Sequence, residues 1–192
     1  MERPSNSPSI GFVVAGGRSV RMGRDKALLP WRGTSLLDHA LSRLGQACDE
    51  TRILCGPGPR YLDRGVKVHL DAREGEGPLG GILAGLRISG GAVCLFLAVD
   101  LPNAPVEFLK FLLGLSEGWD AVVPVHSGGP EPLCAVYRAS CLEAISERMR
   151  AGDLKMTAFW PLVRLRRVSE AEIRPFGDPA QLFQNLNSPE DL

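Results

Sequence analysis

The chain has 192 residues, and its 22 Lys and Arg balance 22 Asp and Glu, so the formal net charge at pH 7 is zero. This balance provides no overall charge that would draw the protein to nucleic acid or to an anionic membrane. The five cysteines are odd in number and form no CxxC pair, and no apolar run approaches the roughly 18 residues needed to span a bilayer. We therefore expect a cytoplasmic protein with reduced thiols and with neither a membrane nor a nucleic-acid partner.

Residues 1–9 (MERPSNSPS) carry no apolar core of the kind that a signal peptide needs, so we predict a short disordered lead. The remaining length suits one domain, which we place at residues 10–192. A chain of this size buries roughly 70% of its extended surface, which is enough for a stable core without metal or disulfide support.

Predicted strands and helices alternate along the chain. Strands are expected at residues 10–15, 52–55, 66–70, 93–99, 121–125, 133–137 and 162–168. Helices are expected from residue 36 after the capping pair Thr34-Ser35, and at residues 79–88, 105–115 and 140–150. The alternation predicts an α/β fold of three layers, in which helices cover both faces of a mostly parallel sheet.

The first predicted strand runs into a loop rich in glycine and arginine. Gly16-Gly17 ends the strand, and the nine residues that follow hold four cations: Arg18, Arg21, Arg24 and Lys26. Bare glycines let the backbone approach a ligand, and the arginine fork matches phosphate oxygens. The loop is predicted to bind a polyphosphate, although a solvated basic loop would explain the same charges.

Two aspartates, Asp71 and Asp100, each follow a predicted strand. In a parallel sheet both would lie at the carboxyl edge, together with the basic loop. Mg²⁺ typically takes one or two carboxylates together with substrate phosphates. Asp100 is therefore a candidate magnesium ligand, with a helix cap or turn as the alternative, and Asp71 is a weaker second carboxylate. In the tail, Asn185 and Asn187 would share one face of an extended segment, where they could bind a substrate group or form a turn.

A rival motif is the literal GxGxxG at residues 75–80, with Asp100 twenty residues further on. This pattern is typical of a dinucleotide-binding dehydrogenase. Residues 72–74, however, separate the preceding strand from the glycines, where the dinucleotide turn should be immediate. The rival interpretation also leaves the basic loop unexplained.

Residues 16–26, GGRSVRMGRDK, resemble the signature of nucleotidyltransferases that activate phosphorylated small molecules. Within that superfamily the chain most resembles the molybdenum cofactor guanylyltransferase family. The supporting segments are GPLGG at 77–81, DLP at 100–102, EPL at 131–133 and NLNSPED at 185–191. The resemblance runs from about Ile10 to the last residue.

This resemblance implies a Rossmann-like fold and Mg²⁺-dependent transfer of GMP from GTP to molybdopterin phosphate, with release of pyrophosphate. The implied site residues lie at the end of the first predicted strand, in loops after predicted strands and in the tail. The nucleotide-binding residues would be Val14, Ala15, Gly16, Gly17, Lys26, Asp71 and Asp100. The catalytic residues would be Arg21, Lys26 and Asp100, with Mg²⁺ on Asp100, and Asn185 and Asn187 are candidates for substrate binding.

The chain departs from the family pattern at two places. Val14 stands where the family usually has Leu, and Cys55-Gly56 stands where it tends to carry an Asn, so one nucleotide contact is missing. A cytidylyl- or sugar-phosphate nucleotidyltransferase of the same superfamily therefore stays open, as does a non-catalytic nucleotide-binding module. The expected partners are GTP, molybdopterin and, transiently, other proteins of molybdenum cofactor biosynthesis, and the chain is expected to be a monomer.

Overall fold

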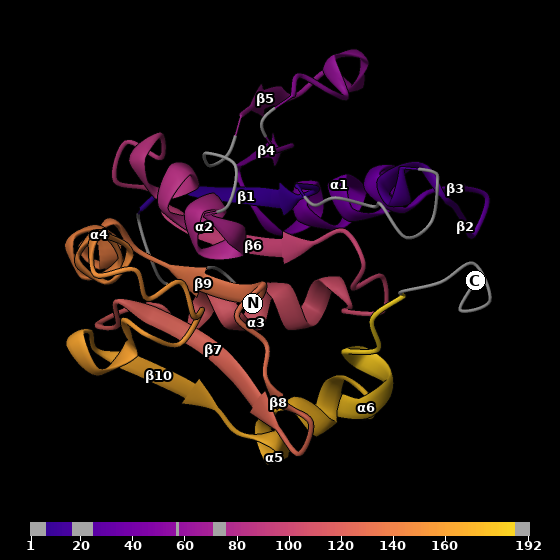
Figure 1. Cartoon of the computed structure of the whole chain (residues 1–192). Helices are drawn as coiled ribbons and strands as arrows, with labels where there is room; N and C mark the ends of the chain where they lie inside the picture. Colours follow the sequence, from indigo (N-terminus) through magenta and orange to yellow (C-terminus); the bar gives the residue numbers. More distant parts are fainter. Residues whose placement is uncertain (1–6, 17–24, 57, 71–75, 187–192) are drawn as a thin grey trace.

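The computed structural model describes residues 7–16, 25–56, 58–70 and 76–186, and its main element is an eight-stranded sheet (Figure 1). The strands of this sheet are β1 (Ser9–Val14), β4 (Glu50–Leu54), β5 (Lys67–His69), β6 (Val93–Ala98), β7 (Ala121–His126), β8 (Gly129–Pro130), β9 (Cys134–Tyr137) and β10 (Leu165–Val168). A separate hairpin pairs β2 (Pro30–Trp31) with β3 (Thr34–Ser35). The helices are α1 (Leu36–Ala47), α2 (Gly77–Arg87), α3 (Val106–Gly114), α4 (Leu142–Arg150), α5 (Glu170–Ile173) and α6 (Pro179–Leu182).

The strand order is β10-β7-β9-β6-β1-β4-β5, with β8 attached to β7. β1 lies between β4 and β6 and is parallel to both. β9 is antiparallel to its two neighbours, β6 and β7, whereas β10 is parallel to β7. The predicted mostly parallel sheet is confirmed, and the insertion of β9 reverses only one of its long strands.

Helices cover both faces of the sheet, as predicted. α1 and α3 pack on one face and α2 and α4 on the other, so that two apolar cores flank the strands (Figure 1). β1 serves both cores, because Val13 points to the first while Phe12 and Val14 point to the second. Burying side chains of this size contributes about 1.5–3 kcal/mol each, which explains why the first strand is apolar at successive positions.

Local sequence signals place the helix ends. The Ser35 hydroxyl accepts a hydrogen bond from the N–H of Asp38 and so caps α1, as predicted. α2 begins at Gly77 with Pro78 in its first turn, where the missing N–H does no harm. α1, for which only the start was predicted, ends at Ala47.

Several boundaries differ from the predictions. Ser9, assigned to the disordered lead, is buried in β1, and its N–H and hydroxyl both donate to the Asp49 carboxylate. The strand predicted from Leu162 begins at Leu165, because Pro161 lies in a 3₁₀ turn at Trp160–Leu162. Residues 179–182, for which no element was predicted, form the short helix α6, and a four-residue helix is too short to show a periodicity.

No helix among the described residues is both long and apolar enough to span a membrane. All five cysteines are buried as free thiols.

Candidate active site

The carboxyl ends of β1, β4 and β6 meet at one edge of the sheet. The N–H of Ala15 donates to the carbonyl of Leu54 (2.8 Å), and the N–H of Val99 donates to the carbonyl of Val14 (3.2 Å). The side chains of Val14 and Ala15 are buried. At the end of β1, therefore, the polar groups that could contact a ligand are those of the backbone. This edge also carries Asp100, two residues beyond the end of β6.

Lys26 and Asp100 form an ion pair at this edge, with Nζ and Oδ2 2.9 Å apart. The two residues are 74 positions apart in the chain. Their side chains are 17% and 26% exposed, so the pair is sheltered but open to a ligand. The predicted convergence of the end of the basic loop with Asp100 is therefore confirmed.

Asp25 holds the backbone next to Lys26. Its carboxylate accepts hydrogen bonds from the Tyr61 hydroxyl (2.7 and 2.8 Å), from Arg60 Nη1 (3.2 Å) and from the N–H of Ala27 (3.1 Å). Burial, reinforced by the Asp25 carboxylate, raises the pKa of the Tyr61 hydroxyl, which therefore stays a donor at neutral pH. Tyr61 has a φ of 62°, uncommon for an aromatic residue, and its contact with Asp25 offsets that strain.

Arg60 ties together the ends of two parallel strands. Its Nη2 donates to the carbonyls of Cys55 (2.6 Å) and Ala15 (3.2 Å), while Nη1 contacts Asp25. One guanidinium therefore links β1, β4 and the segment that carries Lys26. Because the arginine fork is planar and presents several donors, a lysine could not make all three contacts.

Cys55 does not replace the asparagine that the family pattern led us to expect. The thiol is fully buried and turned inward, and its single proton has the carbonyls of Gly58 (3.3 Å) and His69 (3.5 Å) as possible acceptors. Gly56 follows with a φ of 81°, a conformation that favours glycine. This position thus shapes the backbone and presents no side-chain amide to a ligand.

Four predicted site residues lie outside the described residues, and their roles stay predictions: Gly17, Arg21, Asp71 and Asn187. Asn185 is described and exposed. The next residue, Leu186, is buried, and its N–H donates to the carbonyl of Asp100 (3.1 Å). The structure thus brings the backbone of the tail to the metal-ligand candidate.

His126 has no predicted role, and Glu131 was predicted only as part of the EPL motif. His126 Nε2 lies 3.0 Å from Glu131 Oε1, and its Nδ1 accepts from the N–H of Gly128 (3.2 Å), so Nε2 carries the proton and donates. The imidazole also stacks on Phe183, with the ring centroids 5.0 Å apart. This cluster joins β7, the segment before β9 and the tail.

The reversed direction of β9 puts Glu131 at the same edge as Asp100. Leu97 pairs with Cys134, and the N–H of Ala98 donates to the carbonyl of Leu133 (2.7 Å), so the segment before β9 follows the end of β6. Burial raises the pKa of Glu131, and His126 opposes that shift. The EPL motif was the one available signal for this acid, since strand direction is not visible in a local pattern.

The donor set at this edge fits a magnesium ion held jointly by protein and substrate. No cluster of three or more metal-ligating side chains occurs within the described ranges. Asp100 Oδ1 accepts no hydrogen bond from any described residue, which leaves one hard oxygen for a cation. One carboxylate supplemented by phosphate oxygens and water is a common environment for Mg²⁺.

The spacing of the described elements counts against the GxGxxG alternative. Among the described residues β5 ends at His69 and α2 begins at Gly77, so seven positions of the sequence lie between the two, of which 71–75 are outside the described residues. The dinucleotide fingerprint requires an immediate turn between the two.

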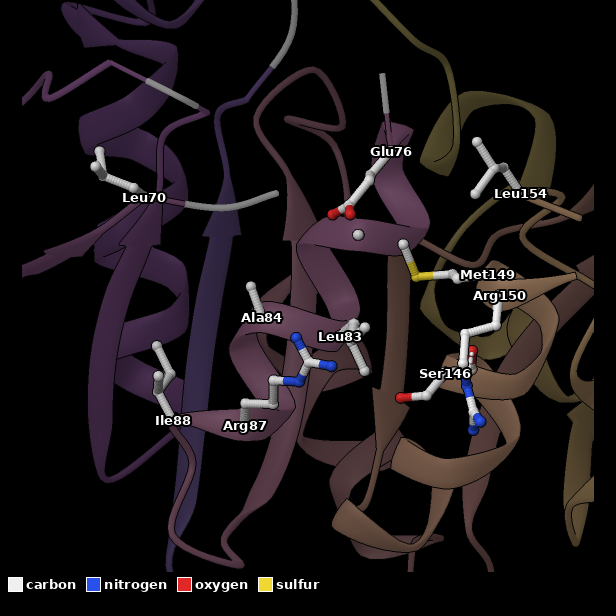
Figure 2. Close-up of a pocket in the computed structure, with 11 residues that line it drawn as sticks. Leu70, Glu76, Leu83, Ala84, Arg87, Ile88, Ser146, Met149, Arg150 and Leu154 are labelled. Carbon is white, nitrogen blue, oxygen red and sulfur yellow. Dashed lines mark hydrogen bonds between the residues drawn. The ribbon is translucent and has the colours of Figure 1, made fainter. Parts of the chain in front are cut away.

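A groove of about 740 Å³ lies between α2 and α4 (Figure 2). Leu83 and Arg87 of α2 face Ser146 and Met149 of α4 across it. Its described lining includes none of the predicted site residues.

Comparison with known proteins decides the family. Residues 11–167 match the MobA-like NTP transferase domain. The chain belongs to that family. The match includes most of the first strand, Lys26, Asp100 and the reversed strand β9. Because the family is one of NTP transferases, this chain is a nucleotidyltransferase. The resemblance seen in the sequence is confirmed.

Relatives of this MobA-like NTP transferase extend the match over nearly the whole chain. It is 39% identical over 184 residues to a Pelotomaculum thermopropionicum protein named "Probable molybdenum cofactor guanylyltransferase", covering 96% of this chain and 90% of that protein. It is 32% identical to the molybdenum cofactor guanylyltransferase of Desulfosudis oleivorans, covering 95% and 91%. The crystal structure of molybdopterin-guanine dinucleotide biosynthesis protein A from Archaeoglobus fulgidus superposes with a TM-score of 0.79 at 25% identity, covering 95% and 94%. The Rossmann-like fold is thereby confirmed.

Proposed function

We propose that this nucleotidyltransferase transfers GMP from GTP to the terminal phosphate of molybdopterin and releases pyrophosphate. The observation that carries the proposal is the Lys26–Asp100 pair, 2.9 Å apart at the carboxyl edge beside the end of β1. The names of the relatives support GTP as the donor and the molybdenum cofactor as the acceptor.

The chemistry suits a site without a general base. The attacking group is a phosphate monoester, which is already anionic at neutral pH, so the protein must orient the reactants and neutralise charge. Lys26 would contact the triphosphate together with Arg21, and both would stabilise the departing pyrophosphate. Asp100 would hold Mg²⁺, which when bound supplies charge neutralisation at the transferring phosphate.

The end of β1 would receive the nucleotide through its backbone. The buried side chains of Val14 and Ala15 leave the backbone of these residues, Gly16 and Gly17 as the contact surface. Val14, where the family usually has Leu, is compatible with a backbone contact to the nucleotide, because its side chain belongs to the core. Asp71 would contact GTP.

Asn185 and Asn187 would bind substrate from the tail. Support comes from the hydrogen bond between the N–H of Leu186 and the carbonyl of Asp100, which brings this segment to the proposed metal ligand. We further propose a cytoplasmic monomer that contacts other cofactor-biosynthesis proteins transiently.

One observation favours testing a second donor nucleotide. The Cys55 thiol is turned inward, so no side-chain amide replaces the asparagine expected at this position. A cytidylyltransferase or sugar-phosphate nucleotidyltransferase would tolerate that loss.

The decisive experiment incubates the purified full chain with Mg²⁺, molybdopterin and each nucleoside triphosphate in turn. We expect pyrophosphate release and a guanine dinucleotide product with GTP, and neither when Mg²⁺ is chelated. Equal use of CTP would contradict guanine specificity. Tight nucleotide binding without pyrophosphate release would indicate a non-catalytic module.

A further inference from the structure

The loop after Asp100 is held by side chains of α1. Leu101 and Ala104 are 1% and 0% exposed. The carbonyl of Leu101 accepts from Arg43 Nη2 (3.0 Å), and the carbonyl of Ala104 accepts from Arg43 Nη1 (2.7 Å). A single guanidinium therefore spans the loop that joins β6 to α3.

Arg43 is unusual because it is a buried cation without a nearby carboxylate among the described residues. It is 6% exposed and is the one Lys or Arg of the described residues that is buried. No carboxylate in the described part of the chain lies within ion-pair distance of it, and its Nε has no hydrogen-bond partner there. Burial lowers the pKa of Arg43 to about 10, so the side chain is still charged at neutral pH.

A buried cation without a counterion is destabilising in itself, and an apolar side chain would pack into this core more favourably. The planar guanidinium of Arg43 can donate to two carbonyls at once, which neither a lysine nor a methionine side chain could do in the same geometry. The energetic penalty therefore points to a role in holding the loop.

His39 makes a third contact with the same loop. It lies one turn before Arg43 on α1, and its Nε2 donates to the carbonyl of Pro102 (3.0 Å). Burial lowers the pKa of His39, which keeps the ring neutral near pH 7.

The helix that holds this loop is also joined to Lys26. Lys26 opens the 3₁₀ turn Lys26–Leu28, and the N–H of Leu36 at the start of α1 donates to the carbonyl of Leu29 (3.0 Å). The Lys26 ammonium pairs with Asp100 at one end of the loop, while Arg43 donates hydrogen bonds to two backbone carbonyls further along the same loop.

We propose that Arg43 is a positioning residue for nucleotidyl transfer, which sets the Asp100 carboxylate against Lys26 and a cation by holding the loop that follows it. This inference rests on the proposed function. Arg43 acts only through Asp100 and does not touch the substrate.

The test compares three variants of the full chain: Arg43→Met, Arg43→Lys and Arg138→Met. Arg138 is a matched control, since its Nε also donates to a backbone carbonyl, that of Ser116 (3.1 Å). It follows the last residue of the reversed strand β9 and so lies at the opposite edge of the sheet.

With GTP, Mg²⁺ and molybdopterin, we expect Arg43→Met to lower kcat by about tenfold to a hundredfold, because small displacements of catalytic groups have effects of this size. The Mg²⁺ concentration for half-maximal rate should rise, while KM for molybdopterin changes little. Arg43→Lys should recover part of the rate, and Arg138→Met should match the wild type at equal folded fraction. If Arg43→Met and Arg138→Met have the same kcat and Mg²⁺ requirement, the inference is wrong.

A second readout does not depend on turnover. Mn²⁺ binding in the presence of GTP, followed by electron paramagnetic resonance, should weaken in Arg43→Met and not in Arg138→Met. If the wild type releases no pyrophosphate, the proposed function is wrong, and the Mn²⁺ titration then tests the positioning role of Arg43 by itself. Equal Mn²⁺ binding by Arg43→Met and Arg138→Met would overturn that role. Should Arg43→Met not fold, Arg43→Lys and His39→Phe carry both measurements, with weaker Mn²⁺ binding expected in each.

Discussion

The ammonium of Lys26 lies 2.9 Å from a carboxylate oxygen of Asp100, which joins the end of the basic loop to the end of the sixth strand. A cation and an anion this close neutralise each other, and a ligand that carries both phosphate and metal would engage them separately. The pair is therefore suited to a substrate such as a magnesium-bound triphosphate, whose two components match the two side chains.

Removing either member of this pair should suppress turnover and leave the fold intact. Each of Lys26→Ala and Asp100→Ala deletes a charge-assisted contact of about 1.5–3 kcal/mol, which corresponds to a roughly 10- to 150-fold loss in kcat/KM. Pyrophosphate release is the measurement, with circular dichroism to verify folding.

The exposed Lys110 on α3 offers the control for charge loss alone, and Lys110→Ala should keep the wild-type rate. Because both site residues act on one ligand, the double variant should lose less than the sum of the two single losses. Rates near the wild type in both single variants would place the active site elsewhere.

Tyr61→Phe should destabilise the protein by about 1–2 kcal/mol. The substitution removes a buried hydroxyl that donates to both carboxylate oxygens of Asp25 (2.7 and 2.8 Å). It also leaves the left-handed backbone at position 61 without its compensating contact. Urea unfolding at pH 7 measures the change, and an unaltered midpoint would show that this hydroxyl does not anchor Asp25 in solution.

The stability of the protein should depend on Asp120 in acid. Hydrogen bonds from the Arg164 side chain, helped by Ser140 and by the N–H of Arg164, lower the pKa of this buried carboxyl to about 2. Its pKa in the unfolded chain is about 3.9. The folded form thus binds the proton less tightly, so the stabilisation is complete above about pH 4 and is lost as the pH falls through about 2.

At pH 7 this contribution amounts to about 1–2 kcal/mol, reduced by the solvent exposure of Arg164. Comparing the free energy of unfolding of the wild type with that of Asp120→Asn from pH 7 down to pH 2 measures it. The difference between the two proteins should shrink towards the acid end, and a constant difference would contradict the assignment.

Two glycines, one in β1 and one in α1, should respond to alanine in opposite ways. At Gly11, a Cβ would come within 3.0 Å of Leu44 Cβ and 3.2 Å of the Cys48 sulfur, so the helix would have to move. Gly11→Ala should destabilise the fold by about 1–3 kcal/mol.

Gly45 lies on the exposed side of α1 with nothing within 4 Å of such a Cβ, so Gly45→Ala should stabilise by up to about 1 kcal/mol through helix propensity. Thermal unfolding of the two variants provides the comparison. If Gly11→Ala is as stable as the wild type, the helix does not pack on the strand as closely as the structure shows.

The amino-acid sequence by itself determined the elements whose signals are local. The apolar run from Ile10 marks a doubly buried strand, Ser35 caps a helix, and Gly77-Pro78 begins another. Each signal depends on a few neighbouring residues and therefore does not depend on how distant parts of the chain pack. The basic loop and Asp100 could be placed at one edge because the alternation of strands and helices predicts a parallel sheet, whose strands end together.

Only the tertiary structure decided which side chains meet. Nothing in residues 134–137 reveals that β9 runs backwards, because a strand pattern records burial and not direction, and that reversal is what brings Glu131 to the edge of Asp100. Arg43, likewise, is an ordinary helical arginine in the sequence, and its contact with Leu101 joins residues 58 positions apart. Such contacts depend on how distant elements pack, which short-range periodicity does not encode.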